Sequence, residues 1–268
     1  MGEKLTDLII LSTYLLLGMV AGIVGGLLGL GGGIIIVPSL LFLFMWQGLP
    51  ADVLMHFAVA TSLFTIVFTS VSSSYAHHKH KAVLWPQVFL LTPGIIAGAI
   101  FGAFIADYLS SDVLRRAFGI FEIFVACQIG LAVKPTIQRV LPGRKGMLFA
   151  GGGIGTLSTI LGIGGGTLTV PFLIWCQIDI RKAVATSSAC GFPIALAGTL
   201  TMIFTGLDYS NLPENTIGYV YWPAAVAILF TSVLFAPVGA KLAHTMPVNS
   251  LKRVFAIVLA CVGLRMLF

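Results

Sequence analysis

Apolar residues in this chain gather into long runs that short polar segments separate. Most runs hold about 20 residues, which is the length that a helix needs to cross the hydrocarbon core of a bilayer. Two runs, 34–46 and 167–177, reach only about 20 Å or less as helices and are too short to cross it. The ten runs cover residues 8–30, 34–46, 57–76, 83–106, 113–133, 146–163, 167–177, 184–206, 219–240 and 249–268. This pattern predicts an all-α polytopic membrane protein.

Each short run follows directly on a glycine-rich phrase. GLGGGIIIVP over residues 29–38 returns as GIGGGTLTVP over residues 162–171, with six of the ten positions identical. A glycine run interrupts a helix and leaves backbone N–H and C=O groups unpaired, and lipid cannot satisfy them. Pro38 and Pro171 weaken the helical hydrogen bonding further. Matching interruptions in the two halves of a membrane protein indicate the binding site of a transporter.

The two halves of the chain resemble each other beyond this phrase. The corresponding segments are 58–62 and 183–187 (AVATS in both), 85–86 and 222–223 (WP in both), and 114–118 and 251–255. A basic stretch that carries two prolines lies between the halves. We therefore predict a first transmembrane repeat over 1–133, a basic linker loop over 134–145 and a second transmembrane repeat over 146–268.

The basic residues indicate how the short runs are placed. If the glycine-interrupted pairs 8–46 and 146–177 each return to the side they came from, eleven Lys and Arg residues face one side and four the other. If each pair crosses once, the division is seven to eight. The positive-inside rule favours the first arrangement and places loops 77–82 and 134–145 in the cytoplasm. Because each half then crosses an odd number of times, we expect two inverted-topology repeats, each with a glycine-broken helix pair plus three spanning helices.

The composition narrows the class of protein further. The chain is 58% hydrophobic and 9% charged, with a mean hydropathy of +1.04, which leaves too few charges to cover a soluble domain. Its net charge of +6 comes from basic residues at the ends of apolar runs, which is typical of membrane topology and not of a nucleic-acid partner. The N-terminal sequence lacks the features of a cleaved signal peptide, so we expect that it is not removed. Since no nucleophile–base pair, phosphate loop or paired carboxylates occur, we expect neither an enzyme nor a cofactor.

The glycine phrases predict an anion site. A helix that begins just after Gly33 or Gly166 would direct its first unpaired N–H groups, and the positive end of its dipole, at the interruption. Glycine also lets an oxyanion approach the backbone closely. In the second copy Thr167 and Thr169 add hydroxyl donors, whereas Ile34 and Ile36 occupy those positions in the first. We therefore expect an asymmetric site, with the two interruptions close together.

Two groups of hydroxyl residues open long apolar runs at matching places of the halves. Such hydroxyls can cap a helix, bond to the backbone or bind a substrate, and both copies keep them. The predicted substrate-binding residues are Gly31, Gly32, Gly33, Gly164, Gly165, Gly166, Thr167, Thr61, Ser62, Thr186, Ser187 and Ser188. Other glycines have the four-residue spacing of helix packing, and we assign Gly22 and Gly26, and Gly94, Gly98 and Gly102, to that role.

Glu122 is a carboxylate deep within an apolar run, which makes it a candidate for proton coupling. The second half has Leu259 at the equivalent place, so Glu122 is not part of the duplicated pattern. A local hydrogen-bonded or water-exposed acid is the alternative.

Other polar residues have plainer interpretations. The segment HHKHK over 77–81 has no Cys or carboxylate nearby, so we expect a solvated cytoplasmic turn and no metal site. The four cysteines, Cys127, Cys176, Cys190 and Cys261, show no CxxC spacing and are expected to be buried thiols, with a sulfur relay as the alternative.

The glycine motif carries a resemblance. Residues 25–33, Val37-Pro38, their repeat over 162–171 and the ATS segments at 60–62 and 185–187 resemble the sulfite exporter TauE/SafE family. The family's members are polytopic transporters linked to sulfite, thiosulfate and organosulfonates. The resemblance implies that Gly31–Gly33 and Gly164–Gly166 belong to the substrate region. It also implies that the partner is a small sulfur oxyanion or sulfonate, moved outward across a bacterial inner membrane.

These observations together predict a secondary transporter in that membrane, an exporter of small sulfur-containing anions such as sulfite or organosulfonates. Rocking of the two halves would give alternating access, and coupling to a proton or another ion is a further hypothesis. Two alternatives stay open. One is a channel-like or cation permease in which glycine carbonyls face the permeant, and the other is a membrane sulfur-relay protein that uses cysteines.

Overall fold

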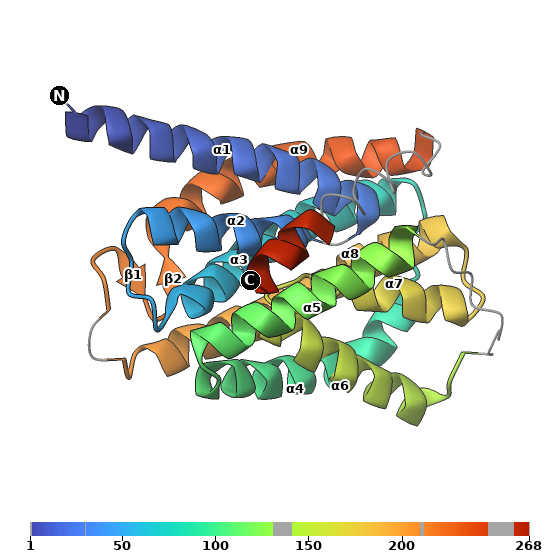
Figure 1. Cartoon of the computed structure of the whole chain (residues 1–268). Coiled ribbons are helices and arrows are strands. Elements are labelled where there is room, and N and C mark those ends of the chain that lie inside the picture. Colours follow the sequence, from blue (N-terminus) through green and yellow to red (C-terminus); the bar gives the residue numbers. More distant parts are fainter. Residues whose placement is uncertain (1, 30, 131–140, 210–211, 246–259, 268) are drawn as a thin grey trace.

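The computed structural model describes residues 2–29, 31–130, 141–209, 212–245 and 260–267, which form a bundle of helices with one small hairpin (Figure 1). The helices are α1 (Gly2–Leu28), α2 (Gly33–Trp46), α3 (Leu54–Lys79), α4 (Trp85–Tyr108), α5 (Ser111–Gly130), α6 (Arg144–Ile160), α7 (Gly166–Trp175), α8 (Ile180–Gly206) and α9 (Trp222–Thr245), and residues 260–267 are also helical. The hairpin pairs β1 (Thr216–Ile217) with β2 (Val220–Tyr221) antiparallel, Thr216 opposite Tyr221.

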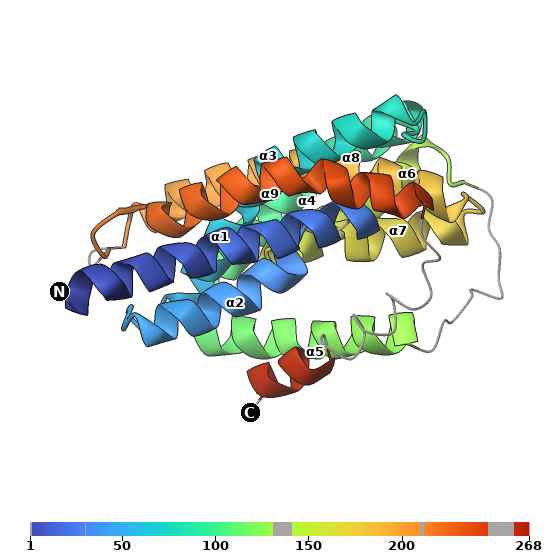
Figure 2. The same cartoon turned by 90° about the horizontal axis from the view of Figure 1, so that it is seen from above.

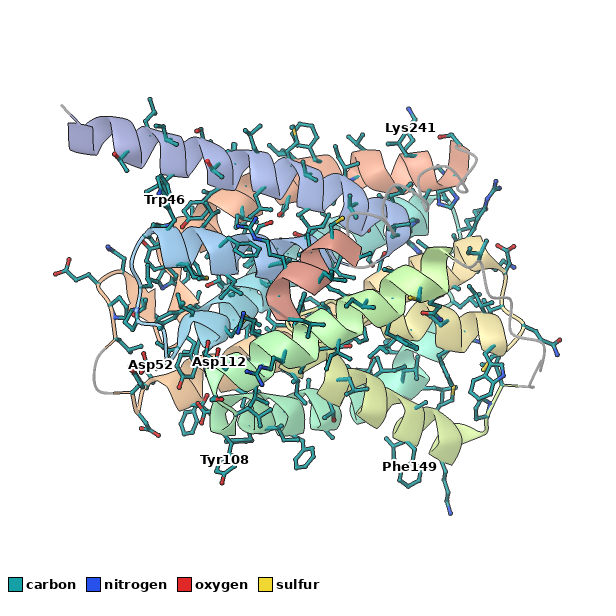
Figure 3. All side chains as sticks on the ribbon, viewed as in Figure 1. Trp46, Asp52, Tyr108, Asp112, Phe149 and Lys241 are labelled. Atoms are coloured by element: carbon teal, nitrogen blue, oxygen red, sulfur yellow. The ribbon has the colours of Figure 1, made fainter. Side chains whose placement is uncertain are left out.

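The all-α polytopic membrane fold predicted from the sequence is confirmed. Within the described residues five helices are long and apolar enough to cross a membrane, namely α1, α3, α4, α8 and α9, while α2 and α7 are shorter apolar helices. Large apolar side chains cover the outside of the bundle as lipid requires. Phe149 is 79% exposed and, like Tyr108, points away from the helices in Figure 3. The chain is therefore an integral membrane protein.

Close glycine contacts hold two pairs of helices together. On α1, a Cβ at Gly22 or Gly26 would overlap the backbone of α9. On α4, a Cβ at Gly94, Gly98 or Gly102 would overlap the backbone of α6. The packing role predicted for these glycines is confirmed, because only glycine lets the helix axes approach so closely.

The order of contacts gives the direction of each helix. Successive glycines of α1 contact successive residues of α9, so these two helices are parallel: the contacts are Gly18–Ile228, Gly22–Ser232 and Gly26–Ala236. Helices α4 and α6 are parallel for the same reason, with the contacts Gly94–Leu148, Gly98–Gly152 and Gly102–Thr156. Helices α3 and α9 are also parallel, with contacts from Phe64–Trp222 to His77–His244. In contrast, α3 and α8 are antiparallel: Ser73 bonds to Ser188, and Leu63 lies against Gly198. Hence α1, α3 and α9 run one way and α4, α6 and α8 the other (Figure 1).

Helices of the two repeats interleave and do not form two separate bodies. The sequence matches pair α1 with α6, α3 with α8 and α4 with α9. In the structure α1 packs along α9 while its counterpart α6 packs along α4, and α3 packs against α9 while α8 packs against α4. Each of these contacts therefore has an equivalent between the corresponding helices of the opposite repeats. Helices α3 and α8, which correspond to each other, meet at the centre.

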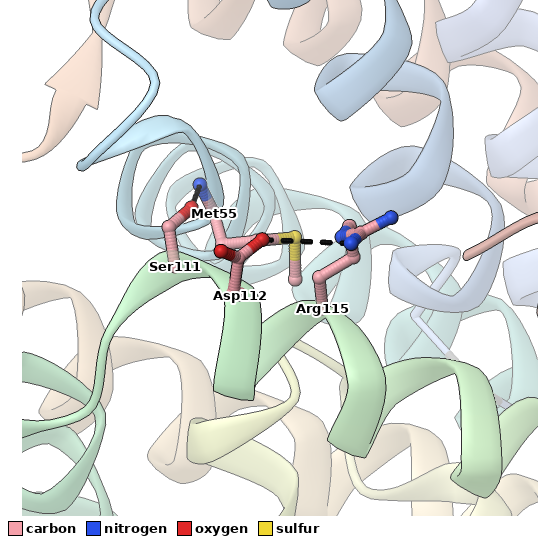
Figure 4. Close-up of polar contacts among 4 residues, drawn as sticks. All are labelled: Met55, Ser111, Asp112 and Arg115. Carbon is pink, nitrogen blue, oxygen red and sulfur yellow. Dashed lines mark hydrogen bonds and ion pairs between the residues drawn. The ribbon is translucent and has the colours of Figure 1, made fainter. Parts of the chain in front are cut away.

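Helix α5 lies at the edge of the bundle, beside the helical residues 260–267 (Figure 2). Its N-terminus is fixed to that of α3, because the Ser111 hydroxyl accepts a 2.9 Å hydrogen bond from the Met55 amide (Figure 4). Asp112 in the first turn pairs with Arg115 at 3.5 Å. That exposed pair contributes little to stability, so the buried Ser111 contact is the anchor.

Candidate functional site

The two glycine phrases interrupt the chain's helices at corresponding positions. Helices α2 and α7 begin at Gly33 and Gly166, where the sequence predicts helix starts. Glycines at two corresponding positions of each phrase have the positive φ that other residues rarely adopt: Gly29 (φ 69°) and Gly162 (φ 67°), and Gly32 (φ 84°) and Gly165 (φ 74°). In the first phrase Gly31 (φ 69°) has a positive φ as well. Each long helix therefore ends just before the first glycine of its phrase, and each short helix begins at the last one.

The two interruptions touch each other inside the bundle. A Cβ placed on Gly31 would lie 3.2 Å from the Gly164 Cα, and one placed on Gly33 would overlap the Gly162 carbonyl. The described residues of both phrases are buried from Gly31 to Ile34 and from Gly162 to Thr167. The prediction that the two breaks lie together is confirmed, and the N-termini of two helices meet in the buried centre of the bundle.

Hydroxyls of each repeat bond to the backbone of the other. Ser62 Oγ donates to the Gly162 carbonyl at 2.8 Å, and its counterpart Ser187 Oγ donates to the Gly29 carbonyl at 3.0 Å. The threonines beside them behave alike: Thr61 Oγ1 accepts from the Tyr221 amide at 3.0 Å, and Thr186 Oγ1 accepts from the Leu84 amide at 3.1 Å. Ser188 Oγ donates to Val184 O at 3.2 Å and accepts from Ser73 Oγ at 3.2 Å. In this structure these five predicted hydroxyl groups are hydrogen-bonded to protein partners.

A second set of hydroxyls has no partner. The Oγ1 atoms of Thr167 and Thr169 are buried without a hydrogen bond among the described residues, and so are the hydroxyl oxygens of Ser158, Thr159 and Thr199. Sequence reasoning missed Ser158, Thr159 and Thr199. The signal available was the Ser-Thr pair just before the second phrase, where the first repeat has Gly25-Gly26.

Glu122 is fully inaccessible, and neither of its carboxylate oxygens has a hydrogen-bond partner among the described residues. It lies on α5 against the helical residues 260–267, where a Cβ on Gly263 would be 3.1 Å from the Glu122 Cβ. The interpretation as a water-exposed acid is therefore wrong for the described structure, because α5 turns this face inward.

The expectation of a solvated turn over 77–81 is wrong for His77. Helix α3 continues to Lys79, which keeps His77 on its buried face, and the side chain is fully inaccessible. Its Nε2–H donates to the Gly26 carbonyl at 3.0 Å, and its Nδ1 lies 3.1 Å from His244 Nε2. His78 and His80 are exposed as expected. Among the described residues no cluster of three potential metal ligands is present.

The cysteines are only partly as predicted. Cys176 and Cys190 are buried, but Cys127 and Cys261 are exposed on the outside of the bundle. The expectation of four buried thiols is wrong for these two, since their helices lie at the edge of the bundle and turn the thiols outward.

Packed apolar helices with two short, interrupted helices at the centre are the architecture of a polytopic membrane transporter. The family model described as sulfite exporter TauE/SafE matches residues 14–266, and the chain belongs to this family. A probable membrane transporter protein of Haemophilus influenzae is 33% identical to it, over 94% of this chain and 96% of the relative. Probable membrane transporter proteins of Methanocaldococcus jannaschii and Bacillus subtilis are each 30% identical, over 97% and 94% of this chain and 96% and 95% of the relatives.

Proposed function

We propose that this chain is a secondary transporter that exports a small sulfur oxyanion or sulfonate, such as sulfite, across the bacterial inner membrane by alternating access. The observation that carries the proposal is the direct contact of the two glycine interruptions, Gly31 beside Gly164, at the buried N-termini of α2 and α7. Amides at a helix N-terminus and the positive end of its dipole favour a negative ligand.

The hydrogen bonds around the interruptions favour an anion over a cation. The carbonyls of Gly29 and Gly162 accept from Ser187 and Ser62, and those of Gly32 and Gly165 accept from amides in the first turns of α2 and α7. These four carbonyls are therefore less free to coordinate a cation. The first amides of each short helix remain as donors, and the unpaired hydroxyls can donate as well. A cation permease therefore fits this site less well.

A sulfur relay also fits poorly. The cysteines lie on α5, at the end of α7, on α8 and within residues 260–267, so two are at the edge of the bundle and two are in its interior. Thiol exchange needs neighbouring sulfur atoms with access to each other.

We further propose that the two repeats have inverted topology. The antiparallel contact of the equivalent helices α3 and α8, and the parallel run of α1 with α3, support this arrangement. If α1 and α3 run in the same direction, the α1–α2 pair returns to the side from which it starts. Loops 77–82 and 134–145 would then face the cytoplasm, as the basic residues predict.

The packing suggests which parts would move. Close glycine contacts join α1 to α9 and α4 to α6, and hydrogen bonds join α3 to α9. We propose that α1, α3 and α9 move as one body against α4, α6 and α8. The moving interface is then the α3–α8 contact at the centre, where both glycine phrases lie, and opening it on alternate sides would expose the site.

The experiment is a flux screen with the purified chain in proteoliposomes. Sulfite, thiosulfate, sulfate and a short alkylsulfonate are compared with sodium and ammonium. Saturable flux of at least one sulfur anion supports the proposal. Flux of the cations alone would overturn it in favour of a cation permease.

A further inference from the structure

Five buried hydroxyl side chains without partners gather at the second interruption. They come from three helices: Ser158 and Thr159 from α6, Thr167 and Thr169 from α7, and Thr199 from α8. None is more than 6% exposed. In the described part of the chain only one other hydroxyl, that of Thr205, is buried and unpaired in the same way. Such a concentration is unusual, because buried polar atoms normally have a hydrogen-bond partner.

Elsewhere in the same bundle several buried or half-buried hydroxyls bond to their own helix. Thr69, Thr156 and Thr201 each donate to the carbonyl four residues earlier, at 2.9 Å in all three cases. This back-bonding is the ordinary state of serine and threonine in an apolar helix. The five hydroxyls at the second interruption do not use it, so they are available to a ligand.

The geometry directs these hydroxyls at the start of α7. Ser158 Oγ and Thr169 Oγ1 lie 3.4 and 3.5 Å from the position that a Cβ on Gly165 would take, and Gly165 is the N-cap residue of α7. Thr159 Oγ1 lies 3.2 Å from the corresponding position on Gly198, the neighbour of Thr199. The Ser158 and Thr169 hydroxyls therefore lie beside the N-terminus of α7, whose first amides are donors too.

The first repeat has no such cluster. Where the second repeat has Ser158, Thr159, Thr167 and Thr169, the first has Gly25, Gly26, Ile34 and Ile36. Although helices α2 and α7 begin at corresponding glycines, only the second phrase has side-chain donors. The first phrase can pack against a ligand, but only the second can hold it by several hydrogen bonds.

The charge around the cluster fits reversible binding. No Lys or Arg occurs over residues 146–180 or 183–209, which include α7 and nearly all of α6 and α8. An anion held there would be bound by neutral hydroxyls and amides without a fixed positive charge. A transporter needs this kind of site because the substrate must also leave it.

We propose that Ser158, Thr159, Thr167, Thr169 and Thr199, with the first amides of α7, form a binding site for one oxyanion and that this site lies in the second repeat alone. The inference rests on the proposed function and identifies the residues that would select the substrate. A sulfite ion or a sulfonate group presents three oxygens that can accept several hydrogen bonds at once. A halide is a single atom and could use fewer of these donors, so the site should prefer oxyanions to chloride.

The test measures binding to the purified full-length chain by thermal stabilisation, with sulfite, thiosulfate, methanesulfonate and chloride as probes. The variants are Thr169→Val and Ser158→Ala, which remove one hydroxyl each. Thr201→Val is the matched control, because its hydroxyl already bonds to the Ala197 carbonyl on α8. Thr169→Ser restores the hydroxyl and shows whether a loss is chemical or steric. Size-exclusion profiles confirm that each variant is folded.

Loss of one hydrogen bond to an anion should weaken oxyanion binding about tenfold in Thr169→Val and Ser158→Ala. Thr201→Val and Thr169→Ser should bind like the wild type, and chloride binding should change little. If the wild type binds a sulfur oxyanion but the hydroxyl variants bind it as tightly as Thr201→Val, the hydroxyl site is wrong and the proposed function stands. If the wild type binds none of the sulfur anions, both fall.

Discussion

The Ser62 hydroxyl donates a 2.8 Å hydrogen bond to the Gly162 carbonyl of the opposite repeat, and the equivalent bond runs from Ser187 to the Gly29 carbonyl at 3.0 Å. Each serine belongs to an ATS segment, and each carbonyl belongs to the first glycine of an interruption. The end of each long helix is therefore satisfied by a side chain from the other half. This exchange explains why both copies keep a serine at the same place, and it makes the two glycine breaks depend on each other.

Removal of either serine hydroxyl should destabilise the protein. In Ser62→Ala or Ser187→Ala a buried glycine carbonyl loses its side-chain partner, which should cost about 1–3 kcal/mol each. Chemical unfolding in detergent, followed by circular dichroism, measures the loss. Ser12→Ala is the control, because that exposed hydroxyl bonds only to Ile9 of its own helix. Stability of Ser62→Ala equal to that of Ser12→Ala would contradict the bridging role.

Gly33 should tolerate no side chain. Its φ is not in the left-handed region, but a Cβ there would overlap the Gly162 carbonyl and push the two interruptions apart. Gly33→Ala is therefore expected to abolish transport in proteoliposomes. Gly153→Ala is the matched control, since a Cβ at this helical glycine meets nothing within 4 Å, and alanine should even stabilise α6 by about 0.5–1 kcal/mol. Normal transport by Gly33→Ala would show that the phrases need not touch.

The sequence could predict the beginnings of α2 and α7, because they depend on local backbone chemistry. A glycine run followed by a short apolar segment fixes the end of one helix and the start of the next. The four-residue glycine spacing in α1 and α4 likewise identified packing faces, since a helix presents such residues on one side.

The hydroxyl cluster could not be predicted as a whole, because it needs α6, α7 and α8 to meet. Ser158 and Thr199 are far apart in sequence, and either could have bonded to its own helix. His77 was misjudged for a related reason. The apolar run ends at residue 76, but α3 continues to Lys79, and burial comes from α1 and α9 packing on that last turn. The hairpin over 216–221 was also missed, and its Tyr221 amide bonds to Thr61.

His77 should contribute to stability through its contact with α1. In His77→Ala the Gly26 carbonyl loses the Nε2–H donor and a buried cavity is left, so unfolding free energy should fall by about 1–3 kcal/mol. His78→Ala changes an exposed side chain in the next position and should cost less than half as much. Thermal unfolding in detergent compares the two. An equal effect of both substitutions would argue against a specific role of the buried ring.

Glu122 is the candidate for proton coupling. Glu122→Gln keeps the shape of the side chain but removes its titratable proton. If protons are coupled through this residue, the variant should transport with a rate that no longer changes with pH. Asp112→Asn is the control, because this carboxylate is on the same helix but 78% exposed. Flux measured over a range of pH in proteoliposomes decides, and a pH profile like that of the wild type would remove Glu122 from the mechanism.

The proposed motion can be tested by cross-links at two interfaces. The hydroxyls of Ser73 and Ser188 lie 3.2 Å apart across α3 and α8, the interface proposed to open. Those of Thr69 and Ser232 lie 2.8 Å apart across α3 and α9, which are proposed to move together. In a background without Cys127, Cys176, Cys190 and Cys261, cysteine pairs at either place are close enough to be oxidised to a disulfide. Oxidation should stop transport in Ser73→Cys/Ser188→Cys, with recovery on reduction, and should leave transport intact in Thr69→Cys/Ser232→Cys.

If both cross-linked proteins transport, α3 and α8 do not separate, and the substrate must pass by another route. If only the α3–α9 cross-link blocks transport, the two bodies are divided differently, because α3 then moves against α9.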